Sequence, residues 1–492
     1  MNYSVAFPSP VHDQVARHLI RADRQEDLCF ALWNPSQGRD RLSACVTEIV
    51  LPLAGDREVH GNVAFNPQYF ARAIRAARGA NCGLALLHSH TGPGWQGMSG
   101  DDIRAEEGHA AATMAATGLP LVGLTIGTDE AWSARFWIRD GARSYRREWC
   151  ESVRVAGRRI AATFHPKLRP APGHRDELTR TVSAWGMKAQ SNLARLRIGV
   201  IGLGSVGAII GETLVRMGIQ HVRLIDFDRV ERLNLDRLLH ATRMSAAKRE
   251  LKVKMFEREF SESATAERFK IDALPYSIVE EEGFRAALDC DVLFCCVDRP
   301  WPRYALNFIA YAHLIPVVDG GLQITPAEDD RGLKRATWRA HVAGPTRRCL
   351  ECLRQYDPGF VGVERAGLLE NPGYIDRLPK DHELRQNENV FGFSLSVAAL
   401  EMQQFLRMAV PHPGHSDVGA LTAHFVRGVI DSDKRPCDDR CPFCKIIAKG
   451  DRTGINDVTG RHEVAERMRA EVPESRPWIG VRTWLRARLG LR

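Results

Sequence analysis

The sequence lacks the features of a membrane-spanning or secreted protein. No stretch approaches the roughly 18 uninterrupted apolar residues that a membrane span needs. The first residues, MNYSVAFPSPVHDQ, do not form the basic region and apolar run that mark a secretory signal. We therefore expect a cytoplasmic protein without a membrane partner.

A concentrated nucleic-acid-binding motif is also missing. The net charge is +8 and the pI is near 8.9, but no run of Lys and Arg is interleaved with aromatic residues. Part of the positive excess lies in residues 448–492, which we interpret as a solvated basic tail or a docking segment for an acidic protein. Nucleic acid is therefore not an expected partner.

The 492 residues are too many for one ordinary core and predict several domains. Strand-like runs alternate with a helix in the first part, which predicts an α/β domain over residues 1–164. The proline-rich residues 165–178 are typical of a linker. Near-continuous apolar runs alternating with helices then predict a Rossmann-like domain with a mostly parallel sheet over residues 179–447.

The cysteines are distributed unevenly. Most of the twelve lie in apolar runs and are typical of reduced core residues, but five gather late in the chain. Two C-x-x-C pairs, Cys349 with Cys352 and Cys441 with Cys444, predict a tetrahedral structural zinc site. Cys437 has no assigned role and is either an alternative zinc ligand, a bystander or a nucleophile.

Two histidines predict a second, catalytic zinc site. His88 and His90 are two residues apart at the end of an apolar strand, so their side chains point to the same side. Ser99 and Asp102 form a capping-box pattern at a helix start, which brings a third ligand toward that strand end. Glu48, an acid inside an apolar run, is the first choice for a general base, and Glu58 is the second.

This combination of a glutamate, H-S-H and S-x-x-D resembles the JAMM (MPN or JAB) metallopeptidases. The resemblance covers roughly residues 1 to 160. It implies that His88, His90 and an aspartate hold zinc, that the glutamate activates water and that Ser99 stabilises the oxyanion. The usual spacing after the second histidine selects Asp101, whereas the serine spacing selects Asp102, which we favour.

A glycine-rich turn begins the second α/β domain. Gly202, Gly204 and Gly207 follow a strand and open a helix, and Asp226 ends the next strand, as in a nucleotide-binding fold. This pattern alone would suit a nicotinamide-dependent oxidoreductase. The residues after it favour an enzyme that handles a triphosphate. They are Asp228, Asn234, Arg237, Lys248 and Asp298, of which Asp298 would support Mg²⁺.

These landmarks resemble the ThiF, MoeB and HesA adenylyltransferases, which are related to ubiquitin-activating enzymes. The resemblance spans residues 175 to 447 and includes the structural zinc. It implies that Asp226 binds the ribose of ATP and that Asn234, Arg237 and Lys248 contact the phosphates. It also implies that Arg180 reaches the ATP of a second protomer in a homodimer. Ser205 replaces a family glycine, and Arg299 replaces an asparagine.

We expect a bifunctional enzyme of a bacterial-type ubiquitin-like pathway. It would adenylate the C-terminal glycine of a small modifier protein with ATP, and a zinc isopeptidase would process or release that modifier. A conjugating enzyme is a possible further partner. The alternatives are activation and trimming of a sulfur-carrier protein, a non-enzymatic scaffold, and a nicotinamide oxidoreductase.

Overall fold

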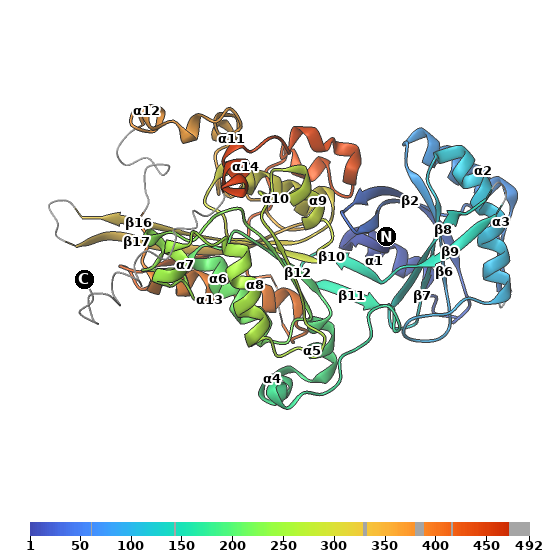
Figure 1. Cartoon of the computed structure of the whole chain (residues 1–492). Coiled ribbons are helices and arrows are strands. Elements are labelled where there is room, and N and C mark those ends of the chain that lie inside the picture. The colour runs from blue at the N-terminus through green and yellow to red at the C-terminus, as the bar shows by residue number, and fades with distance from the viewer. Residues whose placement is uncertain (61, 142–143, 328–331, 379–387, 415–416, 472–492) are drawn as a thin grey trace, which may run out of the picture.

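The computed structural model describes residues 1–60, 62–141, 144–327, 332–378, 388–414 and 417–471 (Figure 1). The end of the predicted basic tail, residues 472–492, lies outside the described residues. Within the described part, no helix has the length and apolar character needed to span a membrane.

The first part of the chain is built on a nine-stranded mixed sheet with the order β11-β10-β1-β3-β2-β6-β7-β8-β9. Three neighbouring pairs are parallel, β1 with β10, β1 with β3, and β6 with β7, and the others are antiparallel. Strands β6 and β7 are buried along their whole length. The strands are β1 (Asn2–Pro8), β2 (Leu28–Gln37), β3 (Arg41–Val50), β6 (Gly83–Ser89), β7 (Leu121–Ile126), β8 (Trp132–Arg139), β9 (Tyr145–Trp149), β10 (Ser152–Ala156) and β11 (Ile160–Phe164).

Separate apolar clusters cover the two faces of this sheet. Helix α1 packs on one face, and helices α2 and α3 pack on the other, next to the small hairpin β4–β5. Asn66 caps α2 by accepting a hydrogen bond from the backbone N–H of Tyr69, and Pro67 suits the first helical turn. The bounds are α1 (Ser9–Leu19), α2 (Pro67–Gly79), α3 (Gly100–Thr117), β4 (Arg57–His60) and β5 (Asn62–Phe65).

The second part contains an eight-stranded sheet with the order β14-β13-β12-β15-β16-β17-β18-β19. The strands from β14 to β16 are parallel, as their near-continuous apolar runs predict, and the strands from β16 to β19 are antiparallel. The strands are β12 (Arg197–Ile201), β13 (His221–Ile225), β14 (Lys270–Leu274), β15 (Val292–Cys295), β16 (Val317–Pro326), β17 (Leu333–Ala343), β18 (Ala420–His424) and β19 (Val429–Asp433).

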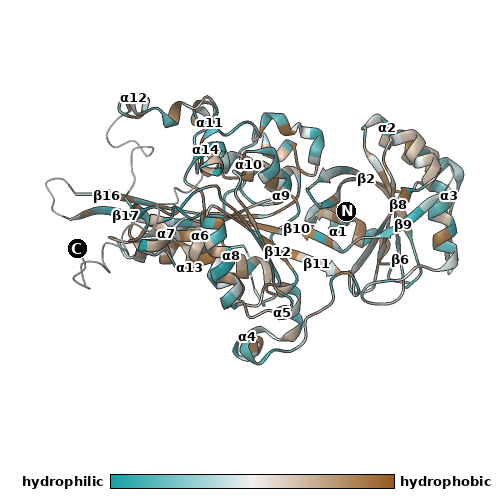
Figure 2. Cartoon of the chain, viewed as in Figure 1, coloured by the Kyte–Doolittle hydropathy of each residue, from teal (hydrophilic) through white to brown (hydrophobic). Residues whose placement is uncertain are grey.

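Helices cover both faces of the second sheet, so its central strands are hidden from water. Helices α6, α8 and α13 bury one face, and α9 and α10 bury the other. Figure 2 shows hydrophobic residues along the strands and hydrophilic residues on helices such as α3 and α8. The helices are α4 (Thr179–Trp185), α5 (Met187–Ala194), α6 (Ser205–Arg216), α7 (Arg243–Ala247), α8 (Lys252–Ser263), α9 (Glu281–Ala287), α10 (Pro300–Ala312), α11 (Pro358–Arg365), α12 (Pro372–Ile375), α13 (Phe391–Ala409) and α14 (Glu463–Ala470).

A buried ionic cluster joins the two parts. The carboxylate of Asp291, just before β15, accepts hydrogen bonds from Arg41 at 2.6 Å, Arg154 at 2.8 Å and Arg169 at 3.1 Å. It also accepts the backbone N–H of Arg197 at 3.0 Å. Burial alone would raise the pKa of Asp291, but the three guanidinium groups hold it well below its usual range. Because breaking buried ion pairs is costly, this cluster fixes the two sheets relative to each other.

The strand directions place the start of β2 and the end of β15 at opposite ends of the structure, far from the contact between the two sheets. The turn after β2 lies at the contact between them, because Arg285 of α9 donates a hydrogen bond to the carbonyl oxygen of Gln37 at 2.7 Å. Strand β2 therefore ends at this contact, and Leu28, which pairs with His88 of β6, lies at the far end of the first sheet. Strand β15 starts at the contact and ends at Cys295 on the outer edge of the second sheet.

Two segments predicted to be loosely attached are packed instead. Arg169, in the predicted linker 165–178, is buried against Asp291. In the predicted tail, Asp451 accepts hydrogen bonds from the backbone N–H of Gln37 at 2.7 Å and from Arg285 at 2.8 Å. The prediction of a solvated tail is therefore wrong for residues 448–471, because buried polar partners anchor this part of the chain.

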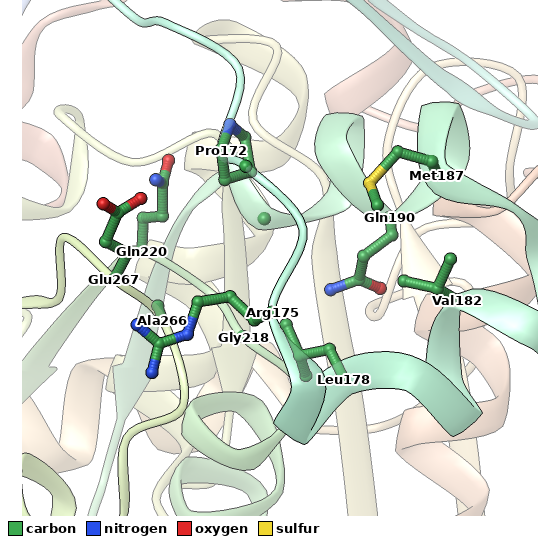
Figure 3. A pocket seen from close by; sticks show the side chains of 12 residues that line it. Pro172, Arg175, Leu178, Val182, Met187, Gln190, Gly218, Gln220, Ala266 and Glu267 are labelled. Atoms are coloured by element: carbon green, nitrogen blue, oxygen red, sulfur yellow. The ribbon is translucent and has the colours of Figure 1, made fainter.

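A pocket lies beside the connecting segment (Figure 3). Pro172 and Arg175 line it from that segment, Gln190 from α5, and Gln220 and Glu267 from the loops before β13 and β14. The amino ends of parallel strands lie at this edge, opposite the edge where α/β sheets bind ligands. The pocket is thus separate from the edge at which the carboxyl ends of the strands lie.

Candidate functional site

The first candidate site consists of His88, His90 and Asp102 at the outer end of the first sheet. Their ligand atoms all lie within 4.8 Å of one another. The two Nε2 atoms are 3.2 Å apart, and the carboxylate oxygens of Asp102 lie 3.4 Å from His88 Nε2 and 3.3 Å from His90 Nε2. Two imidazoles and a carboxylate converging on one point form a donor set that fits zinc with an open fourth position.

The start of α3 determines which aspartate takes part. The backbone N–H of Ser99 donates to Asp102 Oδ2 at 2.7 Å, and the N–H of Asp102 donates to Ser99 Oγ at 3.1 Å. This capping box turns Asp102 toward the histidines. Asp101, the alternative ligand, is 71% exposed and pairs with Arg104 on the outside of the helix.

The surroundings of His88 and Asp102 favour the deprotonated forms of these two side chains, which are the forms that bind a cation. Burial and the nearby Arg135 lower the pKa of His88 to about 3, so its imidazole is neutral at pH 7. The hydrogen bond to Asp102 raises the pKa of His90. Burial alone would raise the pKa of Asp102, but its contacts with His90 and His88 lower it below its usual range. The aspartate is therefore an anion at neutral pH.

Buried polar groups lie beside His88. Thr125 Oγ1 lies 3.3 Å from His88 Nε2, the nitrogen that also faces Asp102, and Arg135 donates to Thr125 Oγ1 at 2.6 Å. Arg135 is paired with Glu106 of α3, which also accepts a hydrogen bond from the indole of Trp137 at 2.7 Å. This network joins β7 and β8 to α3, the helix that carries Asp102, and β7 pairs directly with the strand that carries His88.

Glu48, the predicted general base, lies far from these ligands. It pairs with Leu32 in β2, whereas His88 pairs with Leu28. At about 3.3 Å per residue, the four-residue offset places Glu48 roughly 13 Å further along the sheet. Its side chain is exposed, as is that of the second choice, Glu58 on β4. The assignment of Glu48 is wrong because an acid inside an apolar run marks only a solvent-facing strand position.

Glu26 lies beside the site instead. Continuing the antiparallel register from the Leu28–His88 pair places Glu26 opposite His90. Burial raises the pKa of Glu26, and its carboxylate interacts electrostatically with His90 and Asp102. A carboxylate next to the ligands with a raised pKa suits a general base. Sequence analysis missed Glu26 because it precedes β2 rather than lying inside an apolar run.

The second candidate site begins at the glycine turn between β12 and α6. Gly202 has φ +89°, and a side chain there would meet the carbonyl oxygen of Cys296. A side chain at Gly207 would overlap the carbonyl oxygen of Gly202. Gly204, by contrast, faces open space at the start of α6, so a phosphate has room to approach the helix N-terminus.

The carboxylates beside this turn surround a buried lysine. Asp226 accepts hydrogen bonds from the backbone N–H groups of Leu203 at 2.5 Å and Asp228 at 2.6 Å, and burial raises its pKa to about 6. Lys252 Nζ lies 2.8 Å from Asp228 Oδ2. Burial alone would lower the pKa of Lys252, but Asp226 and Asp228 raise it to about 12. Asp298 contributes to the same effect, so all three carboxylates lie near this cation.

Lys252 replaces Lys248 as the lysine of the site. Lys248 caps the C-terminus of α7 and is exposed, whereas Lys252 begins α8 and is buried. The prediction of Lys248 is wrong because the loop after α7 turns the next helix, and with it Lys252, back toward Asp228.

Asn234 and Arg237, which are also predicted to contact phosphate, form hydrogen bonds within their own short segment of chain. The Asn234 side chain accepts the backbone N–H of Glu231 at 2.9 Å and so caps a short turn. Arg237 donates to the carbonyl oxygen of Leu233 and to Asp236, both within its own loop. Arg180 lies exposed on α4. In the structure these side chains are not gathered around Lys252.

Asp298 follows β15 and is exposed at the outer edge of the sheet. Beside it, Glu364 of α11 accepts the backbone N–H of Trp301 at 2.8 Å, and burial raises the pKa of this glutamate to about 7. Arg303, one turn into α10, is paired with the buried Asp319 at 3.2 Å. Sequence analysis did not select Glu364, which comes from a distant segment with no motif of its own.

Ser205, which replaces a family glycine, has a structural role. Its hydroxyl accepts hydrogen bonds from Ser394 Oγ and Asn389 Nδ2, both at 3.0 Å. These contacts tie the start of α6 to α13, the helix that covers the same face of the sheet.

The late cysteines form a group that is larger than the predicted set. The sulfur atoms of Cys349, Cys352, Cys437 and Cys441 lie within 4.8 Å of one another. Cys349 Sγ is 3.6 Å from Cys441 Sγ, and the backbone N–H of Cys349 donates to Cys437 Sγ at 3.1 Å. Cys444 is exposed, and its thiol interacts with those of Cys437 and Cys441. Cys437 and Cys444 are therefore alternatives for the fourth ligand beside Cys349, Cys352 and Cys441.

The hydrogen bonding of the sulfurs distinguishes Cys437 from its neighbours. Contacts with Cys349 lower the pKa of Cys437 to about 5, which favours a thiolate. Four convergent sulfurs fit a closed tetrahedral zinc site. This placement makes Cys437 a metal-ligand candidate rather than a free nucleophile.

The parallel sheet, the glycine turn and the carboxylates at its outer edge are typical of nucleotide-binding α/β domains. Residues 177–413 match the ThiF family. This part of the chain, just under half of its length, is therefore similar to that family, and the match does not extend over residues 1–176.

Curated relatives match the chain over part of their length. The adenylyltransferase and sulfurtransferase UBA4 of Meyerozyma guilliermondii is 28% identical over 141 residues, which cover 28% of this chain and 32% of that protein. The ubiquitin-like modifier-activating enzyme 5 of Rattus norvegicus is 26% identical over 176 residues, which cover 32% of this chain and 43% of that protein. The chain thus spans less than half the length of these relatives.

Among solved structures, that of MccB with selenomethionine-labelled MccA from E. coli is similar to this chain. The two are 16% identical with a TM-score of 0.43, and the aligned region covers 56% of this chain and 75% of the MccB chain.

Proposed function

We propose that the second domain activates the C-terminal carboxylate of a small ubiquitin-like or sulfur-carrier protein with ATP. The ThiF-family match and the names of the relatives, which include activating enzymes and adenylyltransferases, support this proposal. The observation that carries it is the buried Lys252 between Asp228 and the edge that bears Asp298.

In this reaction, a carboxylate oxygen of the modifier attacks the α-phosphorus of ATP. The bond from the α-phosphorus to the bridging oxygen breaks, giving an acyl-adenylate and pyrophosphate. The open backbone at Gly204 accommodates phosphate oxygens, and Lys252 stabilises the charge that develops on them. Bound Mg²⁺ would neutralise phosphate charge, and Asp298 and Asp228 are suited to hold it.

Cys437 lies among the proposed zinc ligands, which does not favour a thioester on this thiol. A separate conjugating enzyme or a sulfur donor would accept the acyl group. Arg180 is exposed on α4 and is free of the local site, which is compatible with a role toward a second protomer in a homodimer.

Pyrophosphate exchange tests this activity. Lys252→Met should lower ATP–pyrophosphate exchange about 10²- to 10³-fold, as loss of a group that stabilises transition-state charge does. Lys248→Met removes the same charge four residues earlier on an exposed position and should leave exchange unchanged. Equal losses in both variants, or no exchange by the wild-type protein with any modifier ending in glycine, would overturn the proposal.

We further propose that the first domain is a zinc isopeptidase that trims or releases the modifier. The convergence of His88, His90 and Asp102 supports this function. A bound zinc ion would polarise the scissile carbonyl and lower the pKa of water. Glu26 would take the proton from that water and pass it to the leaving amine, and the Ser99 hydroxyl would donate to the developing oxyanion.

Zinc content and cleavage of a modifier fusion test the second activity. His88→Ala should lose one equivalent of zinc and all cleavage while it keeps pyrophosphate exchange. Cleavage that survives in this variant would exclude the site.

The names of the relatives are compatible with two classes of substrate for both proposed reactions, a ubiquitin-like modifier and a sulfur-carrier protein. One relative carries a sulfurtransferase activity in its name and another a ubiquitin-like modifier. The second candidate function, activation and trimming of a sulfur carrier, uses the same residues. The acceptor of the acyl group distinguishes the two: a thiol or amine of a conjugation partner, or a sulfur donor.

A further inference from the structure

The chain after the ThiF match crosses the nucleotide edge. We call residues 455–471 the C-terminal strap. In Figure 1 its helix α14 lies next to α10 and α11. The backbone N–H of Gly460 donates to the carbonyl oxygen of Val279 at 2.8 Å, and the indole of Trp301 donates to the carbonyl oxygen of Val458 at 2.7 Å. The strap thus joins the loops that follow β14 and β15.

The same strap holds the loop after β13, which carries the carboxylates of the nucleotide site. Arg229, directly after Asp228, donates to the carbonyl oxygens of Met468 at 2.8 Å and Glu471 at 2.5 Å. Arg249 forms two hydrogen bonds with the carboxylate of Glu471, at 2.7 and 3.0 Å. These contacts tie both arms of the Asp228–Lys252 region to one end of α14.

A second ion pair anchors the other side of the helix. Arg469 forms two hydrogen bonds with Glu280, at 2.7 and 2.6 Å, and its guanidinium lies 4.5 Å from the ring centroid of Tyr276. Two-point pairs of this kind fix orientation as well as distance. The position of α14 against the sheet edge is therefore well defined.

His462 connects the strap to the loop most directly. Its ring lies 4.9 Å from the ring of Phe227, the residue between Asp226 and Asp228. Its Nδ1 accepts the backbone N–H of Ala465 at 3.2 Å and so caps α14. The ring therefore packs on the nucleotide loop while its nitrogen is held by the strap.

We propose that the C-terminal strap positions the Asp226–Asp228 loop for ATP, with His462 as its principal positioning residue. The strap lies outside residues 177–413, so this role is additional to the ThiF-family domain. Among the described residues, Asp226 accepts hydrogen bonds from two backbone N–H groups, one of which belongs to Asp228 within the loop itself. Packing of His462 on Phe227 restrains this loop from outside. The inference rests on the proposed ATP-dependent function.

Two substitutions at His462 separate the packing from the helix cap. His462→Asn keeps a side chain that caps α14 but removes the ring that packs on Phe227. His462→Phe keeps a ring and removes the cap. We expect the Asn variant to bind ATP about tenfold more weakly and to show a tenfold higher KM for ATP with kcat within about twofold. The Phe variant should bind ATP like the wild type.

A control on the same helix excludes a general effect of altering α14. Glu466→Gln removes a carboxylate that pairs with the exposed Arg461, and it should leave ATP binding unchanged. Glu471→Gln makes the same change at the contact with Arg249 and should weaken ATP binding. Because Glu466 lies in the first turn of α14 and Glu471 is the C-cap residue that contacts Arg249, the difference reports on the contact with the nucleotide loop.

Titration calorimetry with ATP alone, on the full chain, provides the deciding measurement because it needs no modifier. Wild-type protein that does not bind ATP would contradict the proposed function. Wild-type binding with equal affinity in His462→Asn would overturn the positioning role while leaving the proposed function intact. Equal weakening in the Asn and Phe variants would also overturn it, since the cap and not the packing would then be responsible.

Discussion

The two candidate sites are assembled in different ways. The ligands His88, His90 and Asp102 come from one strand end and the helix that follows it, within 15 residues of sequence. The nucleotide edge brings together the turn at Gly204, the loop around Asp228, the start of α8 and the C-terminal strap. A local site is held by one capping box and one buried network, whereas the dispersed site depends on every loop that reaches the edge.

The two sites also face opposite directions. Strand β2 leads from the outer end of the first sheet to the contact between the sheets, and its ten residues span about 30 Å. Strand β15 leads from that contact to the other outer edge. The two candidate sites therefore lie at opposite ends of the described structure, and the side chains of either site can be altered without touching the other.

The largest expected effect concerns the general base of the metal site. Glu26→Gln should lower cleavage of a modifier fusion about 10²- to 10⁴-fold, the usual contribution of a positioned acid–base group. Zinc content should stay the same, because Glu26 is not among the three ligand residues. The matched variant Glu48→Gln should cleave normally. Loss of cleavage in Glu48→Gln with normal activity in Glu26→Gln would restore the original assignment.

The next effect concerns the buried ionic cluster around Asp291, which joins the two sheets. Asp291→Asn leaves three buried guanidinium groups without their shared anion and should lower the free energy of unfolding by about 3–5 kcal/mol. Denaturant unfolding checks this value, and Asp438→Asn, at a carboxylate that is 74% exposed, serves as the control. A change below about 1 kcal/mol would show that the cluster does not fix the two sheets.

The same cluster has a defined pH dependence. Because the pKa of Asp291 is lower in the folded chain than the value of about 4 for an unfolded aspartate, its stabilisation is complete above about pH 4. It is lost as the pH falls toward the folded pKa. Acid should therefore destabilise the wild type more than Asp291→Asn.

The smallest expected effect concerns direct transfer of the trimmed modifier from the metal site to the nucleotide site, which we expect not to occur. A mixture of His88→Ala and Lys252→Met, each at the concentration used for the wild type, contains the same concentration of each working site as the wild type. Because the sites face apart, the mixture should trim and then activate a modifier precursor at the wild-type rate, within about twofold. Tethering two modules raises local concentration only where geometry lets one substrate reach both. A wild type tenfold faster than the mixture would show direct transfer.

The local site was more accessible to sequence analysis than the dispersed one. H-S-H at a strand end and S-x-x-D at a helix start are short patterns with a single geometric outcome, and they selected the three residues that converge. Glu26 lies 62 residues before His88, and only the antiparallel register of β2 and β6 brings it there.

At the nucleotide edge, the sequence located the glycine turn and Asp226 but not the lysine. Lys248 and Lys252 are both plausible by spacing, and the choice depends on where α8 starts. Sequence patterns identify the residue types that a site needs, whereas loop paths decide which copy of a residue type reaches it.

The position of Arg169 has a consequence for dividing the protein. A cut within residues 165–178 would place Arg41 and Arg154 on one fragment and Asp291 on the other. Each fragment would then expose charges that evolved to be buried, together with the apolar surface around them. The proline-rich segment resembles a natural boundary, but the two parts share the buried contact around Asp291. Separate fragments would have to be co-expressed, or redesigned at this contact, to remain folded.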